Sequence, residues 1–270
     1  MLLEYLIEAM ISIITSTEDN LPLNMIFWEN LKRFTHGPFE LIVIDNQSID
    51  GSRNYFLDNG AKVIYNHHAK KYPDFLLPAV KRAKSDIIAF MSNSMMVSKD
   101  WNKILINDMN MRQREAIAGF TNNQPCNCLK TKLIFQKWKC LRFLIVKLLG
   151  ECYSNFKLST KLMYGDWEKW IENNNGQFGK EASTLISSHL VCKRSYLRNL
   201  GTWIKAGAFR FDESNPIHLS KEVYFHDFGK SDFIRNSKSS VEKQVISLNL
   251  DLEKMRQNVM PVPTEKLILN

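Results

Sequence analysis

IVIDNQSIDGS, residues 42–52, passes abruptly from β-branched apolar residues to polar residues and a glycine. With the residues before it, this stretch predicts a buried strand over ELIVIDNQS, residues 40–48. ISIITST, residues 11–17, has the same form, and the apolar residues of LPLNMIFWENLKRF between the two runs recur near helical spacing. Strand, helix and strand in this order predict a βαβ unit with two parallel strands.

The alternation of helical and strand patterns continues as far as residue 120. It predicts an α/β fold with a mostly parallel, doubly wound sheet and helices on both faces. Ligands of such sheets bind beyond the carboxyl ends of the strands, so the polar residues after each strand form the candidate site. The further predicted elements are a helix closed by Gly60, a strand at 61–66, a helix at about 74–84, a strand at 86–91, a helix opening near Ser98 and a strand at 116–120.

Composition restricts the class of protein. The 270 residues can build one large core, and 44% of them are hydrophobic and 24% charged. No uncharged apolar run approaches the ~20 residues that span a bilayer, and the first residues lack the basic start and cleavage site of a secretory signal. We therefore expect a cytoplasmic protein. The net charge of +8 favours an anionic partner, which is a nucleic acid, a phosphorylated substrate or an anionic membrane.

The five cysteines are an odd number in a chain without an export signal, which indicates free thiols. Alternatively, Cys126, Cys128 and Cys140 share a metal ion, although a C-x-C without a second pair is a weak match to zinc sites.

Residues 129–149 combine leucines with lysines and contain no acidic residue. They predict a basic helical insertion with two interpretations. The helix either lies on an anionic membrane as a peripheral contact, or packs on the domain with its lysines in water. A further helix is predicted in the tail, residues 237–270.

Four features occur in an order that resembles the family 2 glycosyltransferases, enzymes of the GT-A fold that use nucleotide sugars. They are ISIITSTEDN, ELIVIDNQSIDGS, the stretch AVKRAKSDIIAFMSNSMMVSKDW, and a later FDE. The resemblance covers about residues 10–120 and, more loosely, 183–229. It implies a glycosyltransferase domain over 1–236, with a nucleotide part at about 10–120 and an acceptor part at about 121–236.

The resemblance also implies the nucleotide site. Asp45 at the strand end contacts the base or ribose, because a carboxylate there accepts hydrogen bonds from ribose hydroxyls or a uracil N–H. Thr17 and Asp19 face the same ligand, and Ser48 belongs to the same site. Asp50 either contributes to this site or only caps the following helix.

The family's metal-binding acidic pair falls on Ser92, Asn93 and Ser94 of this chain. Hard cations need oxygen ligands, preferably carboxylates, so these residues make a poor metal site. Three alternatives follow: protein cations stabilise the diphosphate in place of a metal, Mg²⁺ or Mn²⁺ binds weakly with help from elsewhere, or catalysis is lost. Asn93 is assigned to the nucleotide and Ser94 to any metal.

The general base of the family is a carboxylate beyond the FDE, which here is Phe211 to Glu213. Glu222 is the first candidate and Asp212 the second. His226, in FHDFG, resembles a late histidine that family members place near the diphosphate or metal. Alternatively, His218, Glu222 and His226 share one face of a helix and bind a metal.

The expected function is transfer of a sugar, from UDP by default, to a saccharide or lipid-linked glycan in polysaccharide synthesis, with inversion at the anomeric carbon. The alternative is a catalytically inactive protein of the same fold that binds nucleotide or glycan. A nucleic-acid partner is not expected, because no binding motif accompanies the charge.

Overall fold

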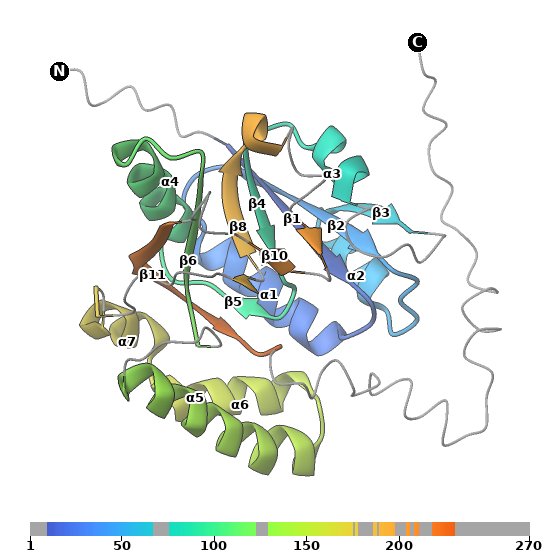
Figure 1. Ribbon diagram of the computed structural model, residues 1–270. Helices are drawn as coiled ribbons and strands as arrows, with labels where there is room; N and C mark the ends of the chain where they lie inside the picture. Colours follow the sequence, from blue (N-terminus) through green and yellow to red (C-terminus); the bar gives the residue numbers. More distant parts are fainter. Residues whose placement is uncertain are drawn as a thin grey trace.

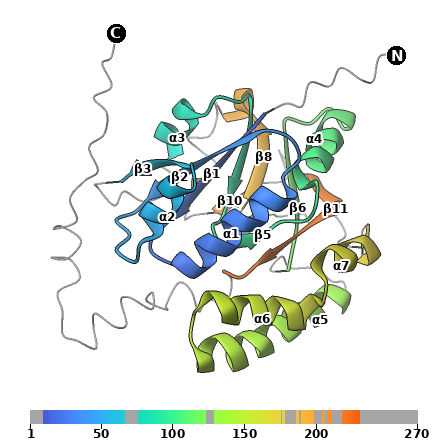
Figure 2. The same ribbon diagram turned by 180° about the vertical axis from the view of Figure 1, so that it is seen from behind.

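The computed structural model describes residues 10–66, 76–122, 129–174, 176–177, 186–187, 189–197, 204–205, 208–210 and 218–229. Within these residues the fold is a curled eight-stranded sheet covered by helices (Figures 1 and 2). The strand order is β3-β2-β1-β4-β8-β6-β11-β5. The strands of this sheet are β1 (Ile11–Thr17), β2 (Phe39–Asp45), β3 (Lys62–Tyr65), β4 (Ile87–Met91), β5 (Met95–Met96), β6 (Ala116–Thr121), β8 (His189–Lys193) and β11 (His218–Asp227).

A small second sheet contains three short strands: β7 (Ile186–Ser187), β9 (Ile204–Lys205) and β10 (Ala208–Arg210). The helices are α1 (Leu21–Phe34), α2 (Ser52–Asp58), α3 (Leu76–Arg82), α4 (Trp101–Met111), α5 (Leu129–Leu141), the π-helical η1 (Arg142–Lys147), α6 (Tyr153–Tyr164) and α7 (Trp167–Asn174).

The central strands are apolar on both faces because helices cover both faces. Ile13 and Ile14 of β1 are both buried and point in opposite directions, as successive strand residues must. Ile13 packs in a cluster with residues of α1, α2 and α4, and Ile14 packs in a second cluster with residues of α3, α5 and α6. The predicted α/β fold with helices on both faces of the sheet is therefore confirmed.

The sheet is mostly parallel, as predicted. β1 pairs in parallel with β2 and β4, β2 with β3, and β6 with β11. β8 runs antiparallel between β4 and β6, and β5 pairs antiparallel with the end of β11. The register of β11 against β6 shifts between Ser220 and Tyr224.

Several predicted boundaries differ from the structure. The helix expected near Ser98 begins at Trp101, and the helices α6 and α7 were not predicted. β11 is a strand, so the helical arrangement of His218, Glu222 and His226 is wrong. The predicted helix in 237–270, and with it the division of the chain at residue 236, lies outside the described residues.

The basic segment at 129–149 is helical, in α5 and η1. Its inner face carries Trp138, Ile145 and Val146, which are buried against the rest of the fold. In the described part of the chain, no helix is long and apolar enough to cross a membrane.

Candidate functional site at the carboxyl ends of the strands

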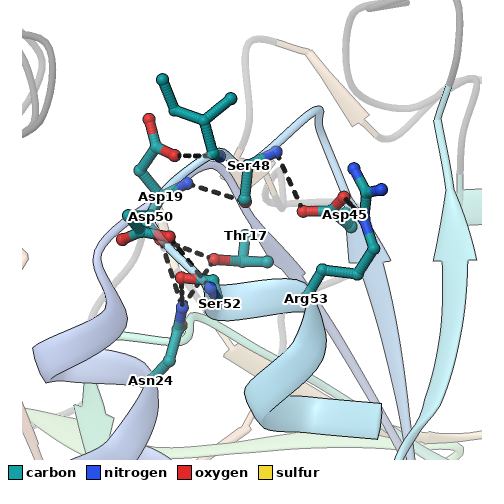
Figure 3. A network of polar contacts seen from close by, with 9 residues as sticks. Thr17, Asp19, Asn24, Asp45, Ser48, Asp50, Ser52 and Arg53 are labelled. Carbon is teal, nitrogen blue, oxygen red and sulfur yellow. Dashed lines mark hydrogen bonds and ion pairs between the residues drawn. The ribbon is translucent and has the colours of Figure 1, made fainter. Parts of the chain in front are cut away.

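The register of the parallel sheet brings two predicted site residues side by side. Thr17 ends β1 and is paired directly with Asp45, the last residue of β2. Both side chains are buried, at 2% and 0% exposure. Figure 3 shows that the loops following the two strands lie against each other and exchange hydrogen bonds.

Asp19 and Ser48 join these two loops. The Asp19 amide donates to Ser48 Oγ at 2.9 Å, and the Ile49 amide donates to Asp19 Oδ1 at 2.7 Å (Figure 3). Thr17 Oγ1 donates to the Asp19 carbonyl at 2.8 Å. Asp19 and Gln47 both have positive φ, a conformation that costs free energy outside glycine and is typical of functional loops. The loops are thus held in one conformation by side chains that the sequence assigned to nucleotide binding.

Asn24 extends the network from α1. Its Nδ2 donates to Thr17 Oγ1 at 2.9 Å and to Ser52 Oγ at 2.8 Å, while its Oδ1 accepts from Asn93 Nδ2 at 2.7 Å. Asn93 follows β4, so Asn24 links the end of β1, the start of α2 and the loop after β4. Sequence reasoning missed Asn24, whose one signal is a polar residue among the apolar positions Leu23 and Ile26; the structure shows that its side chain is fully buried.

Asp45 forms a buried ion pair that the sequence did not reveal. Arg53 Nε of α2 donates to Asp45 Oδ2 at 2.7 Å, and the Ser48 amide donates to Oδ1 at 3.1 Å. The Arg53 guanidinium lies 4.1 Å from the centre of the Tyr65 ring. Arg53 Nη2 is a buried donor with no hydrogen-bond partner among the described residues. A buried donor without a partner is costly, which makes Nη2 a candidate ligand contact.

Asp50 stabilises the starts of two helices. Its Oδ2 accepts from the Leu21 amide at 2.7 Å and its Oδ1 accepts from the Ser52 amide at 3.0 Å. These bonds agree with the capping interpretation, since a carboxylate at a helix N-terminus satisfies amides that have no partner within the helix.

Ser94 contacts a carboxylate from the far end of the chain. Its Oγ donates to Asp227 Oδ1 at 2.8 Å and lies 2.7 Å from Ser92 Oγ. The Gly229 amide also donates to Asp227 Oδ1, at 2.7 Å, and the Phe228 amide donates to the Ser94 carbonyl at 2.9 Å. Residues 92–94 contain no acid, but Asp227 at the end of β11 brings a carboxylate next to them.

His226 points away from Ser94, because successive residues of a strand face opposite sides. Its ring lies among Trp138, Tyr164 and Phe228, and Nδ1 is 2.6 Å from the Tyr164 hydroxyl. Burial, with the positive charge of Arg142, lowers the pKa of His226 to about 3, so the ring is neutral near pH 7. The structure does not bring His226 to the predicted nucleotide residues, and its role at a metal stays a prediction.

Arg142 is the basic residue that we consider as a replacement for the charge of the metal ion. It opens η1, is 8% exposed, and lies one helical turn after Trp138, which packs edge-on against His226 and Phe228. Burial lowers the pKa of the Arg142 guanidinium, and the negative charges of Glu151 and Asp227 act in the opposite direction. The basic segment therefore places one buried positive charge within electrostatic range of Asp227.

The donors around Ser94 do not fit a divalent metal ion. They are two hydroxyls and one carboxylate. That carboxylate, Asp227, already accepts two hydrogen bonds and interacts electrostatically with Arg142. Among the residues that the structure describes, no three His, Cys, Asp or Glu side chains converge as metal ligands. Cys140 is an exposed free cysteine and belongs to no such cluster of described residues. Cys126 and Cys128 lie outside the described residues.

Glu222, the first candidate base, does not lie at the strand ends. Glu222 is exposed in β11, at the register shift, and lies five residues before Asp227. At ~3.3 Å per strand residue this is on the order of 16 Å along the strand. Asp212 lies outside the described residues, so the assignment of a base stays a prediction.

A cavity of about 680 Å³ lies elsewhere, between α1, α6 and α7. Its lining includes Glu29, Arg33, Lys157 and Trp167, and none of the predicted site residues. The strand-end network, rather than this cavity, contains the residues that sequence reasoning selected.

Comparison with known proteins adds an independent observation. Residues 25–149 match the family described as glycosyl transferase family 2. Over this region the chain is similar to the family 2 glycosyltransferases. The match begins within α1, includes α2, β4 and Ser92 to Ser94, and continues through the basic segment of α5 and η1. The resemblance noted from the sequence is thereby confirmed.

Solved structures share the fold of the family 2 domain. The mannosyltransferase PcManGT from Pyrobaculum calidifontis, in complex with GDP-Man and Mn²⁺, has a TM-score of 0.52 at 12% identity, over 92% of this chain and 70% of that chain. S. aureus TarS 1–349 in complex with UDP-GlcNAc has a TM-score of 0.50 at 12% identity, over 91% and 69%. These similarities confirm the predicted GT-A fold.

Other matches are shorter. A second structure of S. aureus TarS 1–349 has a TM-score of 0.38 at 17% identity, and this chain spans 37% of its length. Curated protein sequences give no match to the chain.

Proposed function

We propose that the protein is a glycosyltransferase that moves a sugar from a nucleotide-sugar donor to a hydroxyl of a saccharide or lipid-linked glycan. The observation that carries the proposal is the hydrogen-bonded network of Thr17, Asn24, Ser52 and Asn93, which joins the end of β1, the start of α2 and the loop after β4. Ligands of open α/β sheets bind at this edge. The family 2 match and neighbours in complex with UDP-GlcNAc and GDP-Man support a sugar nucleotide as the ligand.

The nucleoside lies against Asp45, Thr17, Asp19 and Ser48 in this proposal. Asp45, paired with Arg53, accepts from a base N–H or ribose hydroxyl. Arg53 Nη2, which lacks a partner among the described residues, donates to a base carbonyl. UDP is our default donor nucleotide, because a uracil ring offers one N–H for Asp45 to accept and flanking carbonyls to which Arg53 can donate.

The diphosphate lies beside Asn93 and Ser94, and no divalent ion is required. Charge that develops on the leaving diphosphate must be stabilised, and a fixed arginine can do this in place of a metal. Arg142 is the candidate, supported by its burial next to the strand carrying Asp227. Asp227 holds the Ser94 hydroxyl in position and interacts electrostatically with Arg142.

The reaction is a direct displacement with inversion at the anomeric carbon. A carboxylate removes the proton of the acceptor hydroxyl as its oxygen forms the new bond and the nucleoside diphosphate leaves. Glu222 and Asp212 remain our candidates for this base. Replacement of the true base by its amide should lower kcat by about 10²–10⁴-fold while nucleotide binding is kept.

The second candidate function is binding of a nucleotide or glycan without catalysis, favoured by the two serines at the acidic-pair position. A thermal-shift screen against UDP, GDP, CMP and their sugar conjugates, each with EDTA and with Mn²⁺, tests both. A ligand that binds the native state raises its apparent stability. A shift with one nucleotide in EDTA, followed by sugar transfer, supports the proposal. A shift without transfer or donor hydrolysis supports the second function, and no shift contradicts both.

A further inference from the structure

The two antiparallel helical segments α5–η1 and α6, residues 129–164 and called the hairpin below, present apolar side chains to solvent. They lie side by side along one edge of the molecule in both views (Figures 1 and 2). Of the ten exposed large apolar side chains among the described residues, eight belong to this hairpin. They are Leu129, Leu133, Phe143, Leu144, Leu148, Leu149, Leu158 and Leu162, with exposures from 43% to 71%.

The outward leucines are not the core face of the hairpin. Trp138, Val146, Phe156 and Met163 already fill that role, at 5% exposure or less. A helix that is apolar on both its inner and outer faces is not expected to remain uncovered in water. Contiguous exposed apolar patches on soluble proteins mark sites where a partner or a membrane binds.

The charges of the hairpin select the partner. Residues 129–150 contain six basic residues and no acid. Lys132, Lys139 and Lys147 are exposed among the leucines, and Lys147 Nζ lies 5.3 Å from the Phe143 ring centre. A second copy of this chain would place like charges against each other, whereas an anionic lipid surface offers both headgroup charge and acyl chains.

We propose that the hairpin binds the surface of an anionic bilayer, with the outward leucines and Phe143 in the boundary between headgroups and acyl chains and the lysines at the phosphates. Exposed lysines that extend their charge beside buried apolar chains are typical of this arrangement. Anionic lipids concentrate in the cytoplasmic leaflet, which places the protein at the inner face of the membrane.

The same hairpin packs directly on the end of β11. Trp138 lies 4.7 Å from the His226 ring and Phe156 lies 5.6 Å from Phe228, on either side of Asp227. A membrane bound by the outer face of the hairpin is therefore separated from the Ser94 region by little more than one helix layer. If the proposed transfer is correct, this position gives a lipid-linked acceptor access to the donor, and this consequence alone rests on the proposed function.

Sedimentation of the full chain with vesicles tests the inference, using phosphatidylcholine alone and phosphatidylcholine mixed with phosphatidylserine. We expect binding to the anionic vesicles only, weakened by salt. Leu144→Ser with Leu148→Ser should reduce binding more than tenfold. The matched control, Leu57→Ser with Met111→Ser, changes two exposed apolar residues elsewhere and should leave binding unchanged.

A charge series completes the test. Lys132→Gln, Lys139→Gln and Lys147→Gln should each weaken binding by about fivefold, in line with about 1 kcal/mol per basic residue near an anionic surface. Lys81→Gln, Lys103→Gln and Lys221→Gln change exposed lysines outside the hairpin and serve as controls. Equal losses of vesicle binding in both lysine series would contradict the hairpin as the membrane-binding surface.

Failure of the inference and failure of the proposed function give different results. Absence of anionic-vesicle binding, while the nucleotide-induced thermal shift is kept, would overturn the membrane surface alone. A self-associating protein whose dimer is lost in Leu144→Ser with Leu148→Ser would identify a second copy as the partner and also overturn it. Vesicle binding without any nucleotide shift would contradict only the proposed transfer.

Discussion

Asp45 and Arg53 form an ion pair at 8% side-chain exposure or less, and its two members should respond differently to substitution. Asp45→Leu leaves the buried guanidinium without its counter-ion and should lower the free energy of unfolding by about 3–5 kcal/mol. Asp45→Leu with Arg53→Met replaces the pair by apolar groups and should restore most of the loss. Both variants should lose the nucleotide-induced thermal shift. Urea denaturation measures the first effect, and a double variant that still binds nucleotide would exclude this pair from the site.

His189 should make stability depend on pH. Its Nε2 lies 2.9 Å from the Gly119 carbonyl oxygen, its ring packs edge-on against Phe225, and burial lowers the pKa of His189 to about 4. Between pH 6.5 and 4 the unfolded chain binds a proton there and the folded chain does not. The free energy of unfolding is therefore complete above pH 6.5 and falls on acidification, by at most about 1.4 kcal/mol per pH unit from this group.

His189→Gln keeps a hydrogen-bond donor for Gly119 but cannot titrate, so its stability curve over the same pH range should be shallower. His226, with its pKa lowered to about 3, contributes in the same direction and remains in the variant. Denaturation midpoints at several pH values measure the slope. Identical slopes for the wild type and His189→Gln would contradict the buried neutral state of His189.

The end of β11 and the loop after β4 act as one element, and Gly229 shows how closely they approach. A Cβ at Gly229 would collide with Ser94 Oγ and lie 2.9 Å from Asp227 Oδ1. Gly229→Ala should therefore break the Ser94–Asp227 hydrogen bond and destabilise the fold by about 1–3 kcal/mol. Ser94→Ala in the same chain removes the colliding oxygen and should recover part of the loss. A double variant whose loss equals the sum of both single losses would show that the two elements do not touch.

The sequence predicted the elements of the first 120 residues because local periodicity and strand-end polarity are local signals. The strand at 11–17, the helix between the first two strands and the polar ends at Thr17 and Asp45 all follow from such signals. The resemblance selected His226 as the late site residue, yet β11 turns the adjacent Asp227 toward Ser94. Whether His226 or Asp227 faces Ser94 depends on the register of β11, which pairs with residues about a hundred positions away. Hydrophobic periodicity does not reveal this register.

Asn24 was missed, and Arg142 was not singled out within the basic segment, for a related reason. Which face of a helix packs inward depends on its neighbours, and the lysine-rich α5 and η1 offered several basic residues without a preferred one. The insertion of β8 between β4 and β6 is also long-range, since β8 lies about a hundred positions after β4 and about 75 positions after β6.

In the whole molecule, the two functions that we propose lie at neighbouring positions. The ends of β1, β2 and β4 hold the proposed donor site, and the hairpin on β11 carries both the buried Arg142 and the exposed leucines. The cation that replaces a metal in our proposal and the surface that meets the membrane thus belong to the same inserted segment, residues 129–149.

The most direct measurement is calorimetric titration of the nucleotide selected by the thermal-shift screen, in EDTA and in Mn²⁺, with two proteins. The wild type should bind with similar affinity in both buffers, because Arg142 supplies the positive charge. Ser94→Asp with Arg142→Met should bind more than tenfold more weakly in EDTA and regain affinity in Mn²⁺, since the introduced carboxylate and that of Asp227 would then both be offered to the ion. A wild type that binds only with Mn²⁺, or that binds no nucleotide in either buffer, would contradict a metal-independent nucleotide-sugar site at the strand ends.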